Sequence, residues 1–204
     1  MCIDHKRKVI FIHIPKTAGI YIRNILDLPK PKGNLKKDHV KPSYPEIKSN
    51  WENYLTFTFV RNPYDRLVSS YFFDYFRASQ GRFSCQGNIR KEVFHFGNNR
   101  NGFEEFVKNK IHCDFNGNIK YMPMTSILEN KKPDHIFRFE NLNEDLRKAY
   151  FLIHSKNLKI PSTKRINASK HEHFSYYYTN SKIKKMIREY YNEDFIQFGY
   201  KEAK

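Results

Sequence analysis

The chain has 204 residues, enough for one domain with a full hydrophobic core. Hydrophobic residues make up 39% of the sequence and aromatic residues 16%, which favours a packed globular protein over a disordered chain. No stretch approaches the roughly 18 consecutive apolar residues of a membrane span, and the basic N-terminal segment runs into a strand-like pattern rather than forming a signal peptide. The three widely spaced cysteines form neither a metal-binding pattern nor a disulfide framework. We therefore predict a cytoplasmic protein, with a Golgi-type location left open.

Net charge is the strongest compositional feature. The sequence has 37 Lys and Arg residues against 21 Asp and Glu residues, which gives a net charge of +16. Such an excess favours anionic partners, among them nucleic acids, acidic polysaccharides, lipid headgroups and nucleotide cofactors. The alternative is that the charge serves only to keep the protein soluble.

Two strands and their helices are predicted in the first third of the chain. The apolar run Val9–Ile14 (VIFIHI) predicts a strand buried on both faces, as in a parallel sheet, and a helix is expected over Thr17–Leu28. The prolines and the glycine of Leu28–Lys37 end that helix. A short helix is expected around Pro45–Ser49, and Leu55–Val60 (LTFTFV) has the composition of a second strand.

A long helix is predicted to begin at Pro63, because proline fits the first helical position, where its missing N–H has no partner to lose. Apolar and aromatic side chains then recur at the spacing of a core-facing stripe. Arg66 and Ser69 fall off this stripe, and Arg66 is expected to be exposed and paired with Asp65 or Asp74. The stripe comprises Tyr64, Leu67, Val68, Tyr71, Phe72 and Tyr75.

The remaining sequence continues the alternation of helix and strand. The Gly- and Asn-rich stretch Ser79–Gly102 is expected to be a long mobile loop, and Pro161–Tyr178 is expected to be irregular. Since no internal repeat or domain linker is visible, we predict a single α/β domain over residues 1–204, with a central parallel sheet flanked by helices. The other expected elements are a helix over Phe103–Lys110, a strand over His135–Phe139, a helix after Asn141 and a basic amphipathic helix over Ser181–Tyr191.

The turn after the first strand, PKTAGIY at Pro15–Tyr21, has the composition of an anion-binding site. Backbone N–H groups at a helix start are unpaired and partly positive, and Lys16 adds a full charge while Thr17 adds a hydroxyl donor. Ala18 and Gly19 leave room for an oxyanion to approach the backbone. The nucleoside-triphosphate loop needs a glycine four residues before Gly-Lys-Ser/Thr, and this turn lacks it. Taken alone, the turn also fits an ordinary strand-to-helix connection with an exposed lysine.

The second strand ends in a similar way, with Arg61 at its carboxyl end and a helix start just after it. The guanidinium of Arg61 can bind a phosphate through two N–H groups, and a charge at the mouth of a buried sheet needs a partner. Ser69 lies about two turns into the helix, where its hydroxyl can donate. The second segment therefore favours anion binding over an ordinary strand-to-helix connection for the first.

The segments FIHIPKTAGI and FTFVRNPYDRLVSSYF, in this order and at this spacing, resemble the two cofactor signatures of sulfotransferases that use 3′-phosphoadenosine 5′-phosphosulfate (PAPS). The similarity is closest to the carbohydrate sulfotransferase branch, which DHIFRFENLNEDL and the stretch from His171 to Tyr200 also resemble. It covers most of the chain and is weak from Ser79 to Lys132. It implies a sulfotransferase fold with a P-loop-like nucleotide-binding architecture.

The resemblance also implies that the first turn holds the 5′-phosphosulfate of PAPS. Relatives more often have Thr or Ser where Ile20 and Tyr21 stand, so this sequence lacks one or two of their hydroxyl donors. The residues assigned to this part of the cofactor are Pro15, Lys16, Thr17, Ala18, Gly19, Ile20 and Tyr21.

Two further segments match positions that bind the other end of the cofactor. The resemblance assigns Arg61 and Ser69 to the 3′-phosphate. The late segment TKRINASKH resembles a loop that closes over the nucleotide, which makes Lys164, Arg165 and Ser169 candidates for binding it.

Sulfuryl transfer resembles phosphoryl transfer, an in-line displacement in which positioning and charge stabilisation dominate. Lys16 is placed to neutralise the charge that the leaving 5′-phosphate gains. The acceptor hydroxyl needs a base, and we predict His39, in KKDHVKPSYPEI between the two motifs, with Glu46 as the alternative. His13 is expected to be a packed core histidine or a contact near the cofactor. No metal is expected to take part.

The acceptor is expected to carry a hydroxyl group, and the basic composition favours an anionic glycan, with a small lipid or a tyrosine peptide left open. Three other functions stay open. The missing Gly-Lys-Ser/Thr order argues against a P-loop-like nucleotide or metabolite kinase. A basic nucleic-acid-binding protein would need a stacking or groove-reading motif, and none is visible. The third is a sulfotransferase-like protein that has lost its activity.

Overall fold

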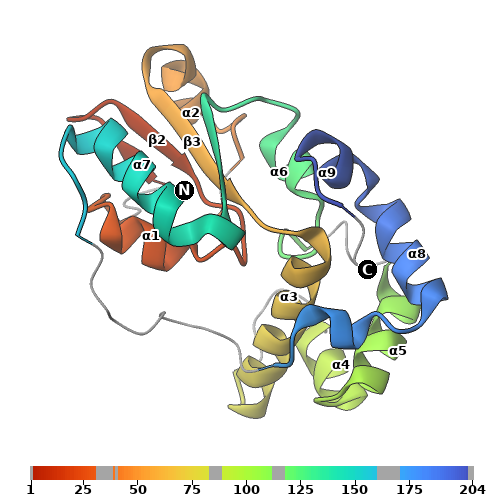
Figure 1. Ribbon diagram of the computed structural model, residues 1–204. Coiled ribbons are helices and arrows are strands. Elements are labelled where there is room, and N and C mark those ends of the chain that lie inside the picture. The colour runs from red at the N-terminus through yellow and green to blue at the C-terminus, as the bar shows by residue number, and fades with distance from the viewer. Residues whose placement is uncertain are drawn as a thin grey trace. The chain divides into compact units, whose positions relative to one another are not determined.

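The computed structural model describes residues 2–30, 39, 41–82, 89–111, 118–159 and 171–201 (Figure 1). The chain divides into two compact units, each with its own hydrophobic core. The first unit contains Met1–Arg61 and Met124–Asn167, and the second contains Asn62–Pro123 and Ala168–Lys204. The single domain predicted over residues 1–204 stays a prediction.

The first unit is built on a four-stranded sheet with the strand order β1-β2-β3-β4. Its strands are β1 (Cys2–Asp4), β2 (Val9–Ile12), β3 (Leu55–Val60) and β4 (His135–Arg138). The pairing of β2, β3 and β4 is parallel, as predicted. β1 was missing from the prediction, because its three residues are too few to show a strand pattern. The turn that follows β1 folds it back onto β2 as an antiparallel edge strand.

Helices flank this sheet, which confirms the predicted α/β class. They are α1 (Gly19–Ile25), α2 (Pro45–Asn50), α6 (Met124–Leu128) and α7 (Leu142–His154), with 3₁₀ helices η2 (Trp51–Asn53) and η3 (Phe139–Asn141). Figure 1 shows α1 and α7 side by side against the sheet, and their apolar side chains share one core with the strands. The register places Phe11 beside Phe57 and Phe59 beside Phe137, so the strands present a continuous aromatic row to that core.

The second unit is helical in its described residues. Its α3 helix begins at Pro63, as predicted, because the Asn62 side chain accepts a hydrogen bond from the Tyr64 N–H at 3.0 Å. The predicted stripe of α3 faces the core, with five members buried and Tyr75 partly buried. The elements are α3 (Pro63–Ser79), α4 (Ile89–Phe96), α5 (Arg100–Lys110), η4 (Phe174–Tyr177), α8 (Ser181–Tyr190) and α9 (Asn192–Gln197).

The long loop predicted over Ser79–Gly102 is wrong. Helix α4 and the first residues of α5 occupy much of this stretch, and Val93 on α4 is completely buried in the core. Among the described residues of this stretch, Gly97 and Asn99 lie at helix ends instead. Gly97 adopts φ 93° just after α4, and the Asn99 side chain caps α5 by accepting a hydrogen bond from the Gly102 N–H at 2.9 Å.

Arg66 is not the exposed residue that its position off the stripe predicted. It is only 1% exposed, and its guanidinium donates to the backbone carbonyls of Lys120 and Met122. One turn later on the same face of α3, the Ser70 hydroxyl lies 3.2 Å from the Lys120 carbonyl oxygen. The polar face of α3 therefore binds a backbone segment distant in the sequence, which no local pattern could reveal.

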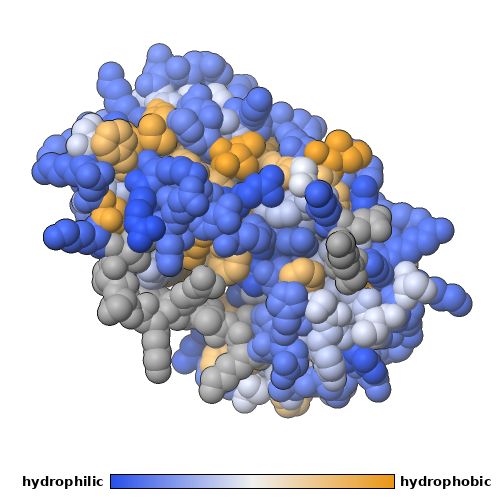
Figure 2. Space-filling view, viewed as in Figure 1, coloured by the Kyte–Doolittle hydropathy of each residue, from blue (hydrophilic) through white to orange (hydrophobic). Residues whose placement is uncertain are grey.

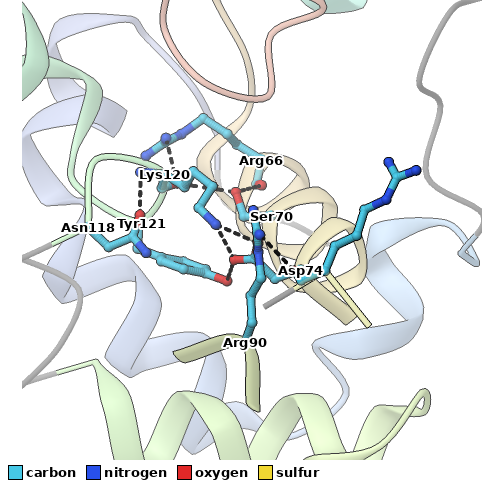
Figure 3. Close-up of polar contacts among 8 residues, drawn as sticks. Arg66, Ser70, Asp74, Arg90, Asn118, Lys120 and Tyr121 are labelled. Atoms are coloured by element: carbon cyan, nitrogen blue, oxygen red, sulfur yellow. Dashed lines mark hydrogen bonds and ion pairs between the residues drawn. The ribbon is translucent and has the colours of Figure 1, made fainter. Parts of the chain in front are cut away.

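Asp74, a further turn along α3, is completely buried and receives three side-chain donors (Figure 3). The Tyr121 hydroxyl donates at 2.7 Å, the Lys120 ammonium at 2.5 Å and the Arg90 Nε at 3.0 Å. Burial lowers the pKa of Lys120, and the adjacent carboxylate opposes that shift. The carboxylate of Asp74 thus compensates two largely buried cations.

Replacing Asp74 with Ala should lower the free energy of unfolding by about 3–5 kcal/mol, because Lys120 and Arg90 would be left without their buried counterion. Urea unfolding measures the loss. Glu105→Ala is the matched control, since it removes an exposed carboxylate that pairs with Lys108 at 3.9 Å, and it should change stability little. If Asp74→Ala lowers the free energy of unfolding by less than about 1 kcal/mol, Asp74 does not act as the buried counterion of Lys120 and Arg90.

Hydrophilic side chains dominate the face shown in Figure 2, with apolar side chains scattered among them. Across the described ranges, none of the helices combines the length and the apolar character needed to cross a lipid bilayer.

Candidate functional site

The turn after β2 lies at the carboxyl end of the parallel strands in the first unit. Its residues alternate in exposure, so that one set faces the interior and the other is accessible. The buried residues are Pro15, Thr17, Gly19 and Tyr21, and the partly exposed ones are Lys16, Ala18 and Ile20. The predicted cation is therefore on the accessible side of the turn.

The buried half of the turn uses its side chains within the protein. The Thr17 hydroxyl, predicted as a donor to the ligand, instead donates to the Ile14 carbonyl oxygen at 2.8 Å and closes the turn. The Tyr21 ring belongs to the core that α1 shares with the sheet. Any contact of these two residues with a ligand at the turn would come from their backbone.

The backbone of the turn has an unusual conformation at two residues. Lys16 and Ala18 have φ values of 69° and 65°, in the left-handed region that residues other than glycine seldom occupy. Left-handed residues alternating with right-handed ones turn successive N–H groups toward one side, which is the geometry of an anion-binding nest. Such strained conformations persist where the surroundings impose them, and they cluster at ligand-binding sites.

Gly19, the first residue of α1, allows the close approach of His13. A Cβ atom built on Gly19 would lie 1.9 Å from the His13 ring, so the ring occupies the space of the missing side chain. The room that the sequence suggested for an oxyanion at Gly19 is therefore filled by an imidazole. The ring of His13 is buried and stacks on Phe11 with centroids 5.8 Å apart, which identifies it as a core histidine.

Arg61 extends from the carboxyl end of β3 to this same turn. Its guanidinium donates from Nη1 to the Lys16 carbonyl oxygen at 3.0 Å and lies 4.0 Å from the centre of the Phe139 ring. Both contacts follow from the sheet, because the parallel register that pairs Val60 with Arg138 places the next residues, 61 and 139, beside each other. The guanidinium of Arg61, which is only 8% exposed, thus lies against the backbone of Lys16 within one unit.

His39 lies at the same end of the sheet. Its Nδ1 is 2.9 Å from the His13 carbonyl oxygen, and the two histidine rings have centroids 4.3 Å apart. A carbonyl oxygen can only accept, so Nδ1 carries the proton in this contact. In neutral His39 the basic nitrogen is therefore Nε2, as a general base requires.

The surroundings of His13 shift its pKa. Burial first, and then the basic groups of His39, Arg23 and Lys16, lower the pKa of His13 well below its ordinary value near 6.5. A positive charge near His13 disfavours its protonated form, so this part of the shift indicates a positive electrostatic potential around this residue. The turn therefore combines basic neighbours with left-handed backbone at Lys16 and Ala18, a conformation found in anion-binding nests, and both features favour an anion.

Glu46, the alternative base, lies at the opposite end of the sheet. Its carboxylate is 3.1 Å from His5 Nε2, and His5 Nδ1 is 2.9 Å from the Tyr54 hydroxyl. His5 follows β1 and Tyr54 precedes β3, so both mark the edge from which the parallel strands start. The length of β3 separates that edge from Lys16 and Arg61, which favours His39 as the base.

The other predicted binding residues are Ser69 and three residues of the late segment. Ser69 is buried on α3 in the second unit, and its assignment to the 3′-phosphate stays a prediction. Lys164, Arg165 and Ser169 lie outside the described residues. Within the described ranges, no group of three or more His, Cys, Asp and Glu side chains is placed to hold a metal ion.

Sequence reasoning missed the contribution of Phe139. The residue was assigned to the end of a strand, and nothing in the local pattern indicates a ring against a guanidinium. The signal that could have revealed it is the alignment of FTFVR with HIFRF, which sets Arg61 level with Phe139 once the strands are taken as parallel neighbours.

A model of the sulfotransferase family matches residues 1–201. Since this covers nearly the whole chain, the protein belongs to the sulfotransferase family, and it is a transferase by class. The α/β sheet with its three parallel strands is consistent with that assignment. No match was found among curated proteins or among solved structures.

Gly19→Ala should destabilise the protein by roughly 1–3 kcal/mol, because the new methyl group would overlap the buried His13 ring. Thermal or denaturant unfolding measures the change. The matched test is a double-mutant cycle: in a His13→Ala background, the same glycine substitution should cost much less. An equal cost in both backgrounds would show that the ring is not the obstacle.

The stability of the protein should fall as the pH drops below about 6.5, partly through His13. The unfolded chain binds a proton at this histidine near its ordinary pKa, whereas the folded chain resists it, so acid favours unfolding. Between pH 7.5 and 5.5, His13→Gln should lose about 1 kcal/mol less stability than the wild type. Identical pH dependence in the two proteins would contradict the depressed pKa.

Proposed function

We propose that this sulfotransferase moves the sulfuryl group of PAPS to a hydroxyl group of an acceptor. The observation that supports the donor most directly is the contact of Arg61 with the Lys16 turn, where its guanidinium donates to the backbone carbonyl oxygen of Lys16 at 3.0 Å. PAPS has a phosphosulfate at one end and a 3′-phosphate on the ribose, so it offers two anionic groups to such a pair. The left-handed backbone at Lys16 and Ala18 and the basic groups around the turn add further support.

Each residue has a distinct role in this proposal. Lys16 and the backbone N–H groups of its turn bind the 5′-phosphosulfate, and Lys16 offsets the charge that develops on the leaving 5′-phosphate. Arg61 binds the 3′-phosphate through the planar arrangement of its N–H donors. Ser69, Lys164, Arg165 and Ser169 are proposed as further nucleotide contacts.

When bound, PAPS supplies an activated sulfuryl group. His39 Nε2 accepts the proton of the acceptor hydroxyl as its oxygen forms a bond to sulfur, while the bond from sulfur to the 5′-phosphate oxygen breaks. The Nδ1 contact with the His13 carbonyl oxygen fixes both the tautomer and the orientation of this ring. His13 itself stays neutral because of its burial and its basic neighbours, so it adds no positive charge beside the base.

An anionic glycan is the proposed acceptor. The net charge of +16 favours polyanions, and a polysaccharide presents many hydroxyl groups. The sequence similarity to the carbohydrate branch points the same way. No structural observation favours the kinase or nucleic-acid alternatives.

Transfer assays with PAPS and unsulfated acidic polysaccharides test this proposal. Lys16→Ala should lower kcat/KM for PAPS by about 100-fold, the usual loss for a group that stabilises developing negative charge. Lys48→Ala, which removes an exposed lysine of α2, is the control and should leave activity unchanged. Wild-type transfer that is insensitive to Lys16→Ala would contradict the role of the turn.

Removing the base should affect turnover rather than donor binding. His39→Ala should lower kcat by roughly 100-fold or more, with KM for PAPS within about twofold of the wild-type value. The exposed His95 of α4 provides the matched control, and His95→Ala should be silent. Wild-type kcat in His39→Ala would exclude His39 as the base, whatever the acceptor.

A further inference from the structure

The segment that carries His39 has a second attachment to the first unit. The Ser43 backbone N–H donates to the Glu129 carboxylate at 2.6 Å, and the Ser43 hydroxyl donates to the other oxygen of the same carboxylate at 2.7 Å. Both carboxylate oxygens are thus used on one residue, 86 positions away in the sequence. Short charge-assisted contacts of this kind fix geometry as well as adding stability.

The backbone of Glu129 has a conformation that glutamate seldom adopts. The residue follows α6 with φ 52°, and Asn130 follows it with φ 58°, so two successive residues are left-handed. Helix ends of this kind usually use Gly or Asn, and a glutamate there is disfavoured. The turn is held by the Asn130 N–H, which donates to the Thr125 carbonyl oxygen at 3.3 Å, and by four buried residues of α6.

The same turn also contacts the helix that follows Ser43. Lys131 lies over the Trp51 ring, with its ammonium 5.0 Å from the ring centre, and Trp51 comes directly after α2. Residues 129 and 131 therefore hold the two ends of the stretch from Ser43 to Trp51. The start of this stretch has little conformational freedom, because Pro42 and Pro45 restrict the backbone on both sides of Ser43.

His39 is four residues before Ser43, and four residues span at most about 14 Å. An anchor at Ser43 therefore limits where the His39 ring can lie, and the Nδ1 contact with the His13 carbonyl oxygen selects one position within that limit. We propose that Glu129 is a positioning residue for sulfuryl transfer: through Ser43, it holds the His39 segment against the Lys16 turn. This inference rests on the proposed role of His39 as the base.

Kinetics of Glu129→Ala and Ser43→Ala test the anchor. Glu129→Ala should lower kcat about tenfold, because small displacements of a catalytic group are costly, while KM for PAPS should stay within about twofold. Ser43→Ala keeps the backbone contact, and Glu129→Gln keeps an acceptor oxygen, so both should lose less. Glu52→Ala removes an exposed carboxylate from the same unit and is the control, with wild-type kinetics expected. If Glu129→Ala does not fold, the comparison is made with Glu129→Gln, for which about a threefold loss is expected.

A double-mutant cycle separates positioning from a general structural role. If Glu129 acts through His39, then Glu129→Ala should not lower the residual rate any further once His39 has been replaced by Ala. An equal loss in both backgrounds, unchanged kcat in the single variant, or a KM for PAPS that rises in step with the loss of kcat would overturn the inference. Wild-type activity in His39→Ala would instead overturn the proposed base, and the positioning role with it. If His39→Ala lowers kcat but Glu129→Ala does not, the positioning role alone would be overturned.

Discussion

The hydrogen bond from the Arg61 guanidinium to the Lys16 carbonyl oxygen is the interaction on which the candidate site depends. It joins the carboxyl end of β3 to the turn that follows β2, and it helps to hold Lys16 in a left-handed conformation. Arg61 is in turn supported from β4, through the ring of Phe139. Three neighbouring parallel strands therefore each supply one part of the cluster, which is a direct consequence of their register.

Several basic groups surround the turn, among them Lys16, Arg23 and His39. A neutral His13 beneath the turn avoids adding another charge, and its ring fits only because residue 19 is glycine. The same histidine provides the carbonyl oxygen that orients His39. An anionic ligand would be attracted by these basic groups, which connects the strained backbone of the turn to the binding function proposed for it.

The sequence was most informative where a pattern is local. The bounds of β3, the stripe of α3 and the start of that helix at Pro63 followed from hydrophobic periodicity and helix capping. Contacts between segments that are far apart in the chain could not be predicted from the sequence. Arg66 is buried because it binds a remote backbone, which its position off the stripe could not show. For the same reason the sequence did not distinguish the accessible half of the turn from its buried half.

Isothermal titration calorimetry with adenosine 3′,5′-bisphosphate tests the paired-cation site most directly, because this nucleotide carries both phosphates and does not react. We predict one binding site in the wild type and an affinity at least about 30-fold lower in Arg61→Ala, the loss expected when a buried charge contact is removed. Arg147→Ala, an exposed arginine of α7, should bind like the wild type. A wild-type protein that does not bind the nucleotide, or a folded Arg61→Ala that binds it equally well, would contradict the account.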